Sequence, residues 1–230
     1  MCYNSEMSFY FATAGILTTI YIYLYENNLV KTGIQYILIF YTLMELLQGF
    51  QYFFVNQCSN LINIILTEFA YILVILQPTI WNLFYYINSN SYDKNLFIVA
   101  IWMSIIWIFV NVLTRIFYDK NDNPQTKKMN IFASDKVCTK QKSTHLYWEW
   151  TSANFGNYTP NFLTYFLIWF VPALISTKFR ITSLILFSSF IIAAIAGNLS
   201  NEQFTIPSLW CYIGVPIMMI IIYFISFNRR

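Results

Sequence analysis

The chain has 230 residues, a net charge of +3, 58% hydrophobic residues and only 10% charged residues. A soluble domain usually carries about 25% charged residues, and folding in water would leave more apolar surface than a chain of this length can bury. The small, scattered net charge also gives no reason to expect a nucleic-acid partner. Composition therefore predicts an integral, multi-pass membrane protein whose main partner is the lipid bilayer.

Seven segments meet or approach the ~20 mainly apolar residues that a membrane-spanning helix needs. In chain order they are residues 8–25, 34–55, 59–87, 96–118, 162–176, 181–196 and 207–227. The fifth and sixth segments are short, and a re-entrant pair in their place would leave five spans. We expect a single all-α domain over residues 1–230, a polytopic transmembrane bundle of about seven spans with an outer loop at about 119–160.

The distribution of basic residues orients this bundle. No Lys or Arg precedes Lys31, and Glu6 lies ahead of the first span, so the positive-inside rule places the N-terminus outside. The outer loop runs against the rule, because it carries Lys120, Lys127, Lys128, Lys136, Lys140 and Lys142. Long loops follow the rule less strictly than short ones, and we keep the N-outside model.

Two further features favour the same orientation. The glycosylation sequons at Asn157 and Asn198 both fall outside, where acceptor sites must lie. Cys58 and Cys138 fall on that side too, where a disulfide can form. The sequence therefore predicts a Cys58–Cys138 disulfide and two outer glycosylation sites.

Ionisable side chains inside a membrane are costly and indicate function by default. Glu45 and Glu68 lie inside the second and third spans, which should be antiparallel neighbours because only a short turn joins them. At ~1.5 Å rise per residue, both carboxyl groups lie ~15 Å from that turn. We therefore expect the two carboxyl groups to share one site, either holding protons or balancing a bound cation.

Other polar residues of the spans recur at helical spacing around these glutamates. Tyr41 and Gln48 flank Glu45 on one face of the second span, and Tyr71, Gln77 and Asn111 lie on the third and fourth spans. The candidate ion or ligand site consists of Tyr41, Glu45, Gln48, Glu68, Tyr71, Gln77 and Asn111. The competing interpretation is that these groups only hydrogen-bond between helices and hold the bundle together.

Catalytic and metal-binding patterns are scarce. The one histidine, His145, lies in the outer loop, and the cysteines lack the spacing of metal ligands. We expect no cofactor and no metal, and an enzyme is the less favoured class. For the aromatic segment 146–150 of the outer loop, we favour an interfacial aromatic belt over a lid that contacts a ligand.

Three short motifs suggest a family. They are MELLQ at 44–48, LQP at 76–78 and PSLWC at 207–211. With these motifs the chain resembles an uncharacterised family of multi-pass membrane proteins of large DNA viruses. The resemblance implies a seven-helix viral membrane protein, in a host or virion membrane, and implies no activity.

The favoured function is conduction or transport of a small cation or of protons through the polar core. The alternative is a receptor-like or scaffold protein whose buried carboxyl groups are structural. The sequence leaves open whether several copies of the chain associate.

Overall fold

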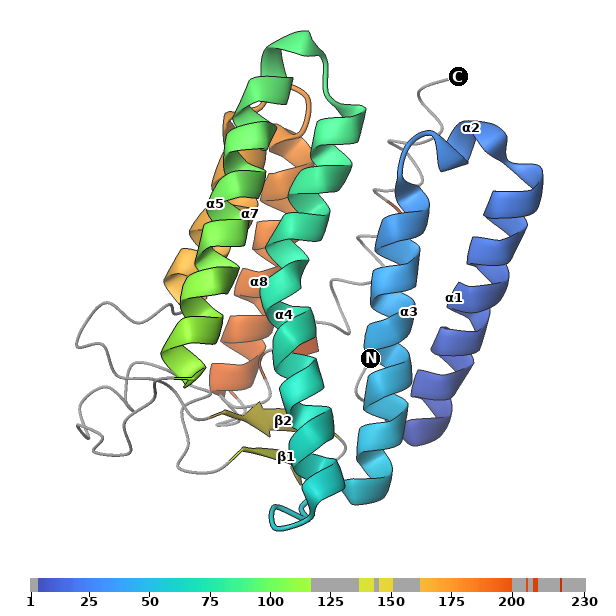
Figure 1. Cartoon of the computed structure of the whole chain (residues 1–230), viewed down its shortest axis with the longest axis vertical. Helices are drawn as coiled ribbons and strands as arrows, with labels where there is room; N and C mark the ends of the chain where they lie inside the picture. The colour runs from blue at the N-terminus through green and yellow to red at the C-terminus, as the bar shows by residue number, and fades with distance from the viewer. Residues whose placement is uncertain are drawn as a thin grey trace.

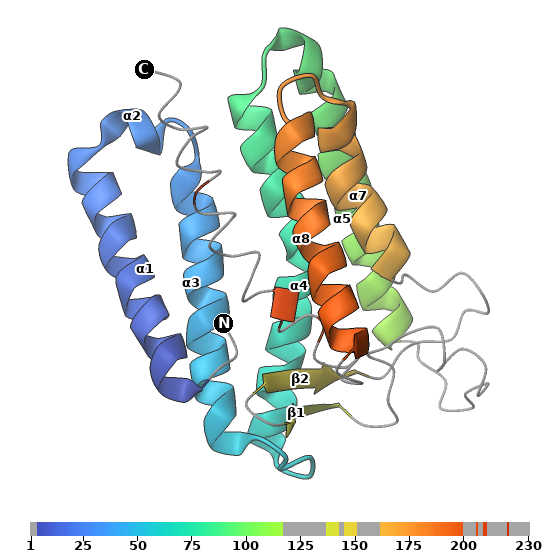
Figure 2. The same cartoon turned by 180° about the vertical axis from the view of Figure 1, so that it is seen from behind.

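The computed structural model describes residues 4–116, 137–142, 145–150, 162–199, 206, 209–210 and 220. The element order over these residues is α1 (Ser5–Tyr25), α2 (Asn27–Val30), α3 (Ile34–Gln51), η1 (Tyr52–Phe54), α4 (Leu61–Asn88), α5 (Ser91–Ile116), β1 (Cys138–Lys142), β2 (His145–Glu149), α7 (Phe162–Ile175) and α8 (Arg180–Leu199). The long helices run along one axis (Figure 1), and α7 and α8 stand behind α4 and α5 when the molecule is turned (Figure 2). Helices dominate the described chain, as the sequence predicts.

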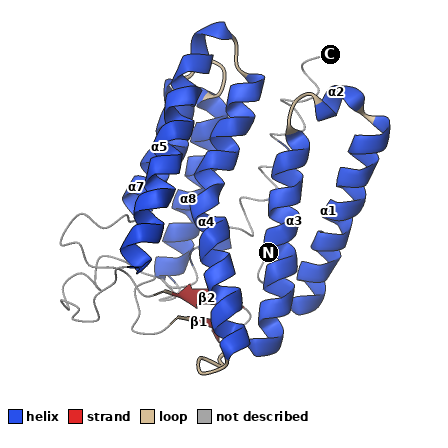
Figure 3. Ribbon diagram, viewed as in Figure 1, coloured by secondary structure: helices blue, strands red, loops and turns tan. Residues whose placement is uncertain are grey.

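The two ends of this bundle differ. One end, the hairpin end, carries the α3–α4 connection and the antiparallel strands β1 and β2 (Figures 1 and 3). The opposite end, the α2 end, carries α2 and the α4–α5 and α7–α8 turns. The start of α1 lies at the hairpin end, which is the side that the sequence predicts to be outside.

Five of the described helical segments are long and apolar enough to cross a membrane. They are Ser5–Tyr25, Ile34–Phe54, Leu61–Asn88, Ser91–Leu113 and Arg180–Leu199. Helix α7 has 14 residues and is shorter than these candidates. The predicted seventh span, 207–227, lies outside the described residues except for 209, 210 and 220, so the expected count of seven stays a prediction.

Local chemistry sets several helix boundaries. The side chain of Asn4 accepts a hydrogen bond of 2.8 Å from the N–H of Met7 and caps α1. Asn60 caps α4 by accepting 2.9 Å from the N–H of Ile62. Gly33 precedes α3 with a φ of 73°, in the left-handed region that glycine adopts without strain.

Helices α1 and α3 pack closely through small residues. Gly15 faces Thr42, and a Cβ on Gly15 would overlap the Thr42 hydroxyl oxygen. Farther along, the ring of Phe9 lies 3.0 Å from where a Cβ on Gly49 would be. Helices in lipid associate through such close approach, because there is no hydrophobic force between them.

The main core is aromatic and joins α4, α5 and α7. Its fully buried large side chains include Trp81, Phe84, Tyr85, Phe97, Trp169 and Phe179. The rings of Trp81 and Trp169 lie 6.0 Å apart between α4 and α7, and those of Tyr85 and Phe97 lie 5.4 Å apart between α4 and α5. These contacts hold α4 at the centre of the larger helical group.

A proline in α7 is matched by a side chain of α4. Pro172 has no N–H, so the carbonyl of Ile168 loses its helical donor. The Asn82 amide nitrogen donates to that carbonyl at 3.1 Å and also contacts the Ser104 hydroxyl at 3.3 Å. Asn82 therefore satisfies a backbone group that would otherwise be unpaired inside the bundle.

Candidate functional site

A buried polar face runs along α3, as the sequence predicts. Glu45 is 7% exposed and Gln48 is 1% exposed, and Tyr41 is half-buried on the same face. The structure adds Gln51, which is 1% exposed and donates from Nε2 to the carbonyl of Leu66 on α4 at 3.0 Å. Spacing alone could have found Gln51, because it lies three residues beyond Gln48 on the same helix.

Two predicted site residues, Tyr41 and Gln77, meet directly. The Tyr41 hydroxyl oxygen accepts hydrogen bonds from Gln77 Nε2 at 2.8 Å and from Trp81 Nε1 at 3.0 Å. The Tyr165 hydroxyl of α7 donates to Gln77 Oε1 at 2.7 Å. A buried network therefore links α3, α4 and α7. Sequence reasoning missed Tyr165, because it is an ordinary aromatic residue in an aromatic segment.

Glu68 is half-buried on α4, and its expected pairing with Glu45 stays a prediction. The α4 residues that face α3 are Leu66, Ala70, Gln77 and Trp81, as their hydrogen bonds and packing show. Glu68 follows Leu66 by two residues, which turns it ~200° around the helix, away from α3. Helical spacing alone therefore does not favour a single site shared by Glu45 and Glu68.

Tyr71 and Asn111 form a separate polar contact between α4 and α5. The Tyr71 hydroxyl donates to Asn111 Oδ1 at 3.0 Å, and Asn111 Nδ2 donates to the carbonyl of Trp107 at 2.8 Å. The described hydrogen bonds thus divide the predicted set into an α3–α4–α7 group and the Tyr71–Asn111 pair.

The segment expected to form the outer loop contains a β-hairpin that the sequence analysis did not predict. Strand β1 pairs with β2 in the register Thr139 with Trp148 and Lys140 with Tyr147. Leu146, Trp148 and Trp150 are buried, whereas the residues between them are half-buried. This alternation has the period of a strand. Segment 146–150 was expected to form an interfacial belt, but every second side chain of it packs against the helices.

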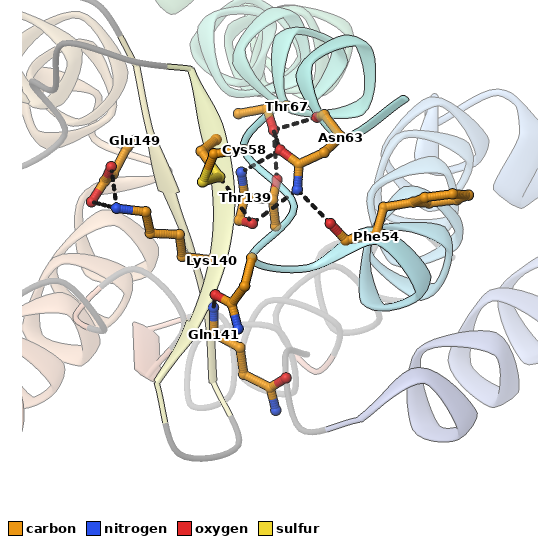
Figure 4. The surroundings of a disulfide bond; sticks show 10 residues. Phe54, Cys58, Asn63, Thr67, Thr139, Lys140, Gln141 and Glu149 are labelled. Carbon is orange, nitrogen blue, oxygen red and sulfur yellow. Dashed lines mark hydrogen bonds and ion pairs between the residues drawn. A yellow bond between two sulfur atoms is a disulfide. The ribbon is translucent and has the colours of Figure 1, made fainter. Parts of the chain in front are cut away.

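A disulfide joins this hairpin to the chain just before α4. It links Cys58 to Cys138, the pair that the sequence predicts, with the two Cα atoms 5.0 Å apart (Figure 4). Cys138 is fully buried. The bond closes a sequence separation of 80 residues, so it ties the outer loop to the α3–α4 connection.

Two asparagines hydrogen-bond to the backbone of β1 through their side chains, Asn56 in the α3–α4 connection and Asn63 in the first turn of α4. Asn63 Oδ1 accepts from the N–H of Thr139 at 3.0 Å, and Asn63 Nδ2 donates to the carbonyls of Thr139 at 3.0 Å and Phe54 at 2.7 Å (Figure 4). Asn56 Oδ1 accepts from the N–H of Gln141 at 3.0 Å. These side chains satisfy the backbone edge of β1, which would otherwise be open to pairing with another chain.

Two tryptophans of the hairpin reach into the helices. Trp148 Nε1 donates to Gln51 Oε1 at 3.0 Å, and Trp150 Nε1 donates to the carbonyl of Thr67 at 3.0 Å. The two indole rings stack with centroids 5.6 Å apart. Since Gln51 continues the polar face of α3, Trp148 covers the end of that face nearest the hairpin.

The other face of the hairpin is polar. Lys140 and Glu149 form an ion pair across the strands, with Nζ and Oε2 2.8 Å apart. Partial burial raises the pKa of Tyr147, with Glu149 adding to the effect and Lys140 opposing it, so the phenol stays neutral near pH 7. The disulfide and the hydrogen bonds thus hold a face with Lys140, Tyr147 and Glu149 in a fixed position.

Of the two predicted glycosylation sites, Asn157 lies outside the described residues. Asn198 is exposed in the last turn of α8, and its Nδ2 donates to the carbonyl of Ala194 at 2.9 Å. Attachment of a glycan to this nitrogen would alter that hydrogen bond. Within the described ranges, no three His, Cys, Asp or Glu side chains gather as a metal site would require.

These features define a class: a mostly helical protein with several helices long enough to cross a membrane and a disulfide-linked hairpin at one end of the bundle. The chain belongs to the family of unknown function DUF5765, whose model matches residues 6–228. It is 25% identical over 243 residues to the Uncharacterized protein R287 of Acanthamoeba polyphaga mimivirus, an alignment that covers 99% of this chain and 97% of that protein. This similarity confirms the expected relation to proteins of large DNA viruses. No solved structure matches the chain.

Proposed function

We propose that this chain is a receptor-like or scaffold protein of a host or virion membrane, with about seven spans and its hairpin end on the non-cytoplasmic side. The observation that carries the proposal is the locked hairpin. A disulfide and several buried side-chain hydrogen bonds hold this short element against the bundle. A surface held in one conformation loses little entropy when a partner binds.

Charge and exposure support the membrane part of the proposal. Large apolar side chains such as Leu17, Trp102 and Ile106 are exposed on the outer faces of α1 and α5, where lipid would cover them. The α2 end carries exposed basic residues, namely Lys31, Lys94, Lys178 and Arg180, as expected of a cytoplasmic side. The disulfide at the opposite end fits an oxidising compartment.

The buried polar groups fit a structural role better than a conduction path. Gln77, Trp81 and Tyr165 all direct their polar atoms at neighbouring helices. Glu45 is almost fully buried, and helical spacing along α4 turns Glu68 away from the side that packs on α3. A path built on two adjacent carboxyl groups therefore loses its geometric basis.

One observation keeps cation or proton conduction as a second candidate. Glu45 is a buried carboxyl group in the middle of a candidate span, which is where ionisable residues of transport pathways lie.

A flux measurement separates the two candidates. In vesicles reconstituted with purified protein, our proposal predicts no proton or cation flux above empty vesicles, for the wild type or for Glu45→Gln. Conduction predicts wild-type flux that Glu45→Gln abolishes, whereas Gln35→Glu, a control on the same helix, would retain it. Flux that depends on Glu45 would overturn the scaffold proposal.

A further inference from the structure

At the α2 end, two turns are bonded into one unit. The α4–α5 turn contributes Asn88 and Asp93, and the α7–α8 turn contributes Ser176 and Lys178. The Ser176 hydroxyl donates to Asp93 Oδ2 at 2.7 Å, and Lys178 Nζ donates to the carbonyl of Asn88 at 2.6 Å. We call these two turns, residues 88–94 and 176–180, the inner turn pair.

The charges of the inner turn pair are arranged asymmetrically. Its carboxylate, Asp93, is 2% exposed and is turned inward to Ser176. Lys94, Lys178 and Arg180 are all exposed. The surface of the inner turn pair is therefore cationic, while its negative charge is buried.

Nearby contacts fix these cations close to the level of the helix ends. Lys94 Nζ lies 5.8 Å from the centroid of the Tyr86 ring. Arg180 Nε donates at 3.0 Å to the carbonyl of Leu174, the residue before the last one of α7. Tyr92, in the first turn of α5, is 83% exposed. Exposed tyrosine beside Lys and Arg at helix ends is typical of the headgroup level of a bilayer.

We propose that the inner turn pair binds the headgroups of anionic phospholipids in the adjacent leaflet. The phosphate and any further negative charge of the headgroup would contact Lys94 and Arg180, and Tyr92 would lie among the headgroups. Basic residues at a membrane surface attract anionic lipid, and the attraction falls off within a Debye length. The surface is distinct from the outer hairpin, and the inference rests on the proposed membrane insertion but not on the scaffold role.

The test measures lipid retained by the full-length protein. The protein is reconstituted in nanodiscs of phosphatidylcholine with phosphatidylglycerol, extracted in mild detergent, and analysed by native mass spectrometry for bound lipid. We expect the wild type to retain phosphatidylglycerol in preference to phosphatidylcholine. Lys94→Gln and Arg180→Gln should each lower that preference about fivefold, because each removes one charge at the surface.

Two controls make the outcome decisive. Lys142→Gln removes the same charge from the exposed end of β1 at the opposite end of the bundle, and it should leave the preference unchanged. Lys94→Arg keeps the charge and should retain it, which excludes misfolding as the cause of a loss. Equal retention of both lipids by the wild type, or an equal loss in Lys142→Gln, would overturn the proposal. So would displacement of the lipid by inorganic phosphate at an ionic strength where chloride has no effect, since that would indicate a site for free phosphate.

Discussion

Replacing both Cys58 and Cys138 by serine should lower the free energy of unfolding by about 4 kcal/mol, the largest effect that we expect from removing one interaction. The bond closes 80 residues of chain, and the entropy that a cross-link removes from the unfolded state grows with the length of the closed loop. The measurement is an unfolding titration of the purified protein in detergent, for the wild type and the double variant.

The wild type treated with a reductant provides the control for the serine substitutions, and it should unfold together with the double variant. The single variant Cys58→Ser should match them as well, because either substitution breaks the bond. An unfolding free energy that does not change when the bond is lost would show that the hairpin and the α3–α4 connection are not linked in the folded protein.

Gly15→Leu should separate α1 from α3 and destabilise the protein by about 3 kcal/mol, the upper part of the usual range for overpacking. The reason is steric, since a single Cβ at Gly15 already overlaps the Thr42 hydroxyl oxygen. The unfolding titration measures this loss, and a cysteine cross-link between the two helices would report their separation.

Ala14→Leu is the matched control, because Ala14 is exposed on the neighbouring face of α1 and the added side chain would meet lipid. This variant should unfold like the wild type. The double variant Gly15→Ala with Thr42→Ala should be more stable than Gly15→Ala alone, because removing the hydroxyl makes room for the Cβ. Equal stability of Gly15→Leu and Ala14→Leu would argue against the close α1–α3 contact.

Hydropathy predicted the described long helices, because lipid requires long apolar segments whatever their packing. The Cys58–Cys138 pairing was also predictable, since the topology placed both cysteines on the same side of the membrane. Tyr41 and Gln77 were identified as polar residues inside spans, although the hydrogen bond between them was not. That bond depends on the register of α3 against α4, which a pattern within one helix does not contain.

The expected Glu45–Glu68 pair shows the limit of this reasoning. Counting residues from the turn gives depth but not the direction in which a side chain points. The bond between Gln51 and the Leu66 carbonyl sets the register. Relative to that level, Glu45 lies ~9 Å deeper and Glu68 only ~3 Å deeper, and Glu68 also faces away from α3. The β-hairpin was missed for a different reason, because tryptophan and tyrosine are typical both of strands and of membrane interfaces.

The proposal of an outer partner-binding surface is tested most directly by a photocrosslinking probe on the hairpin. A photoreactive amino acid replaces Tyr147, which lies on the polar face of β2, and the same probe replaces Tyr92 at the α2 end as the control. Both variants are expressed in membranes of infected host cells and irradiated. We predict that the probe at position 147 gives a discrete protein adduct and that the probe at position 92 does not give the same adduct. The adduct from position 147 should be lost when Cys58→Ser releases the hairpin. No adduct from position 147, or the same adduct from position 92, would contradict the account.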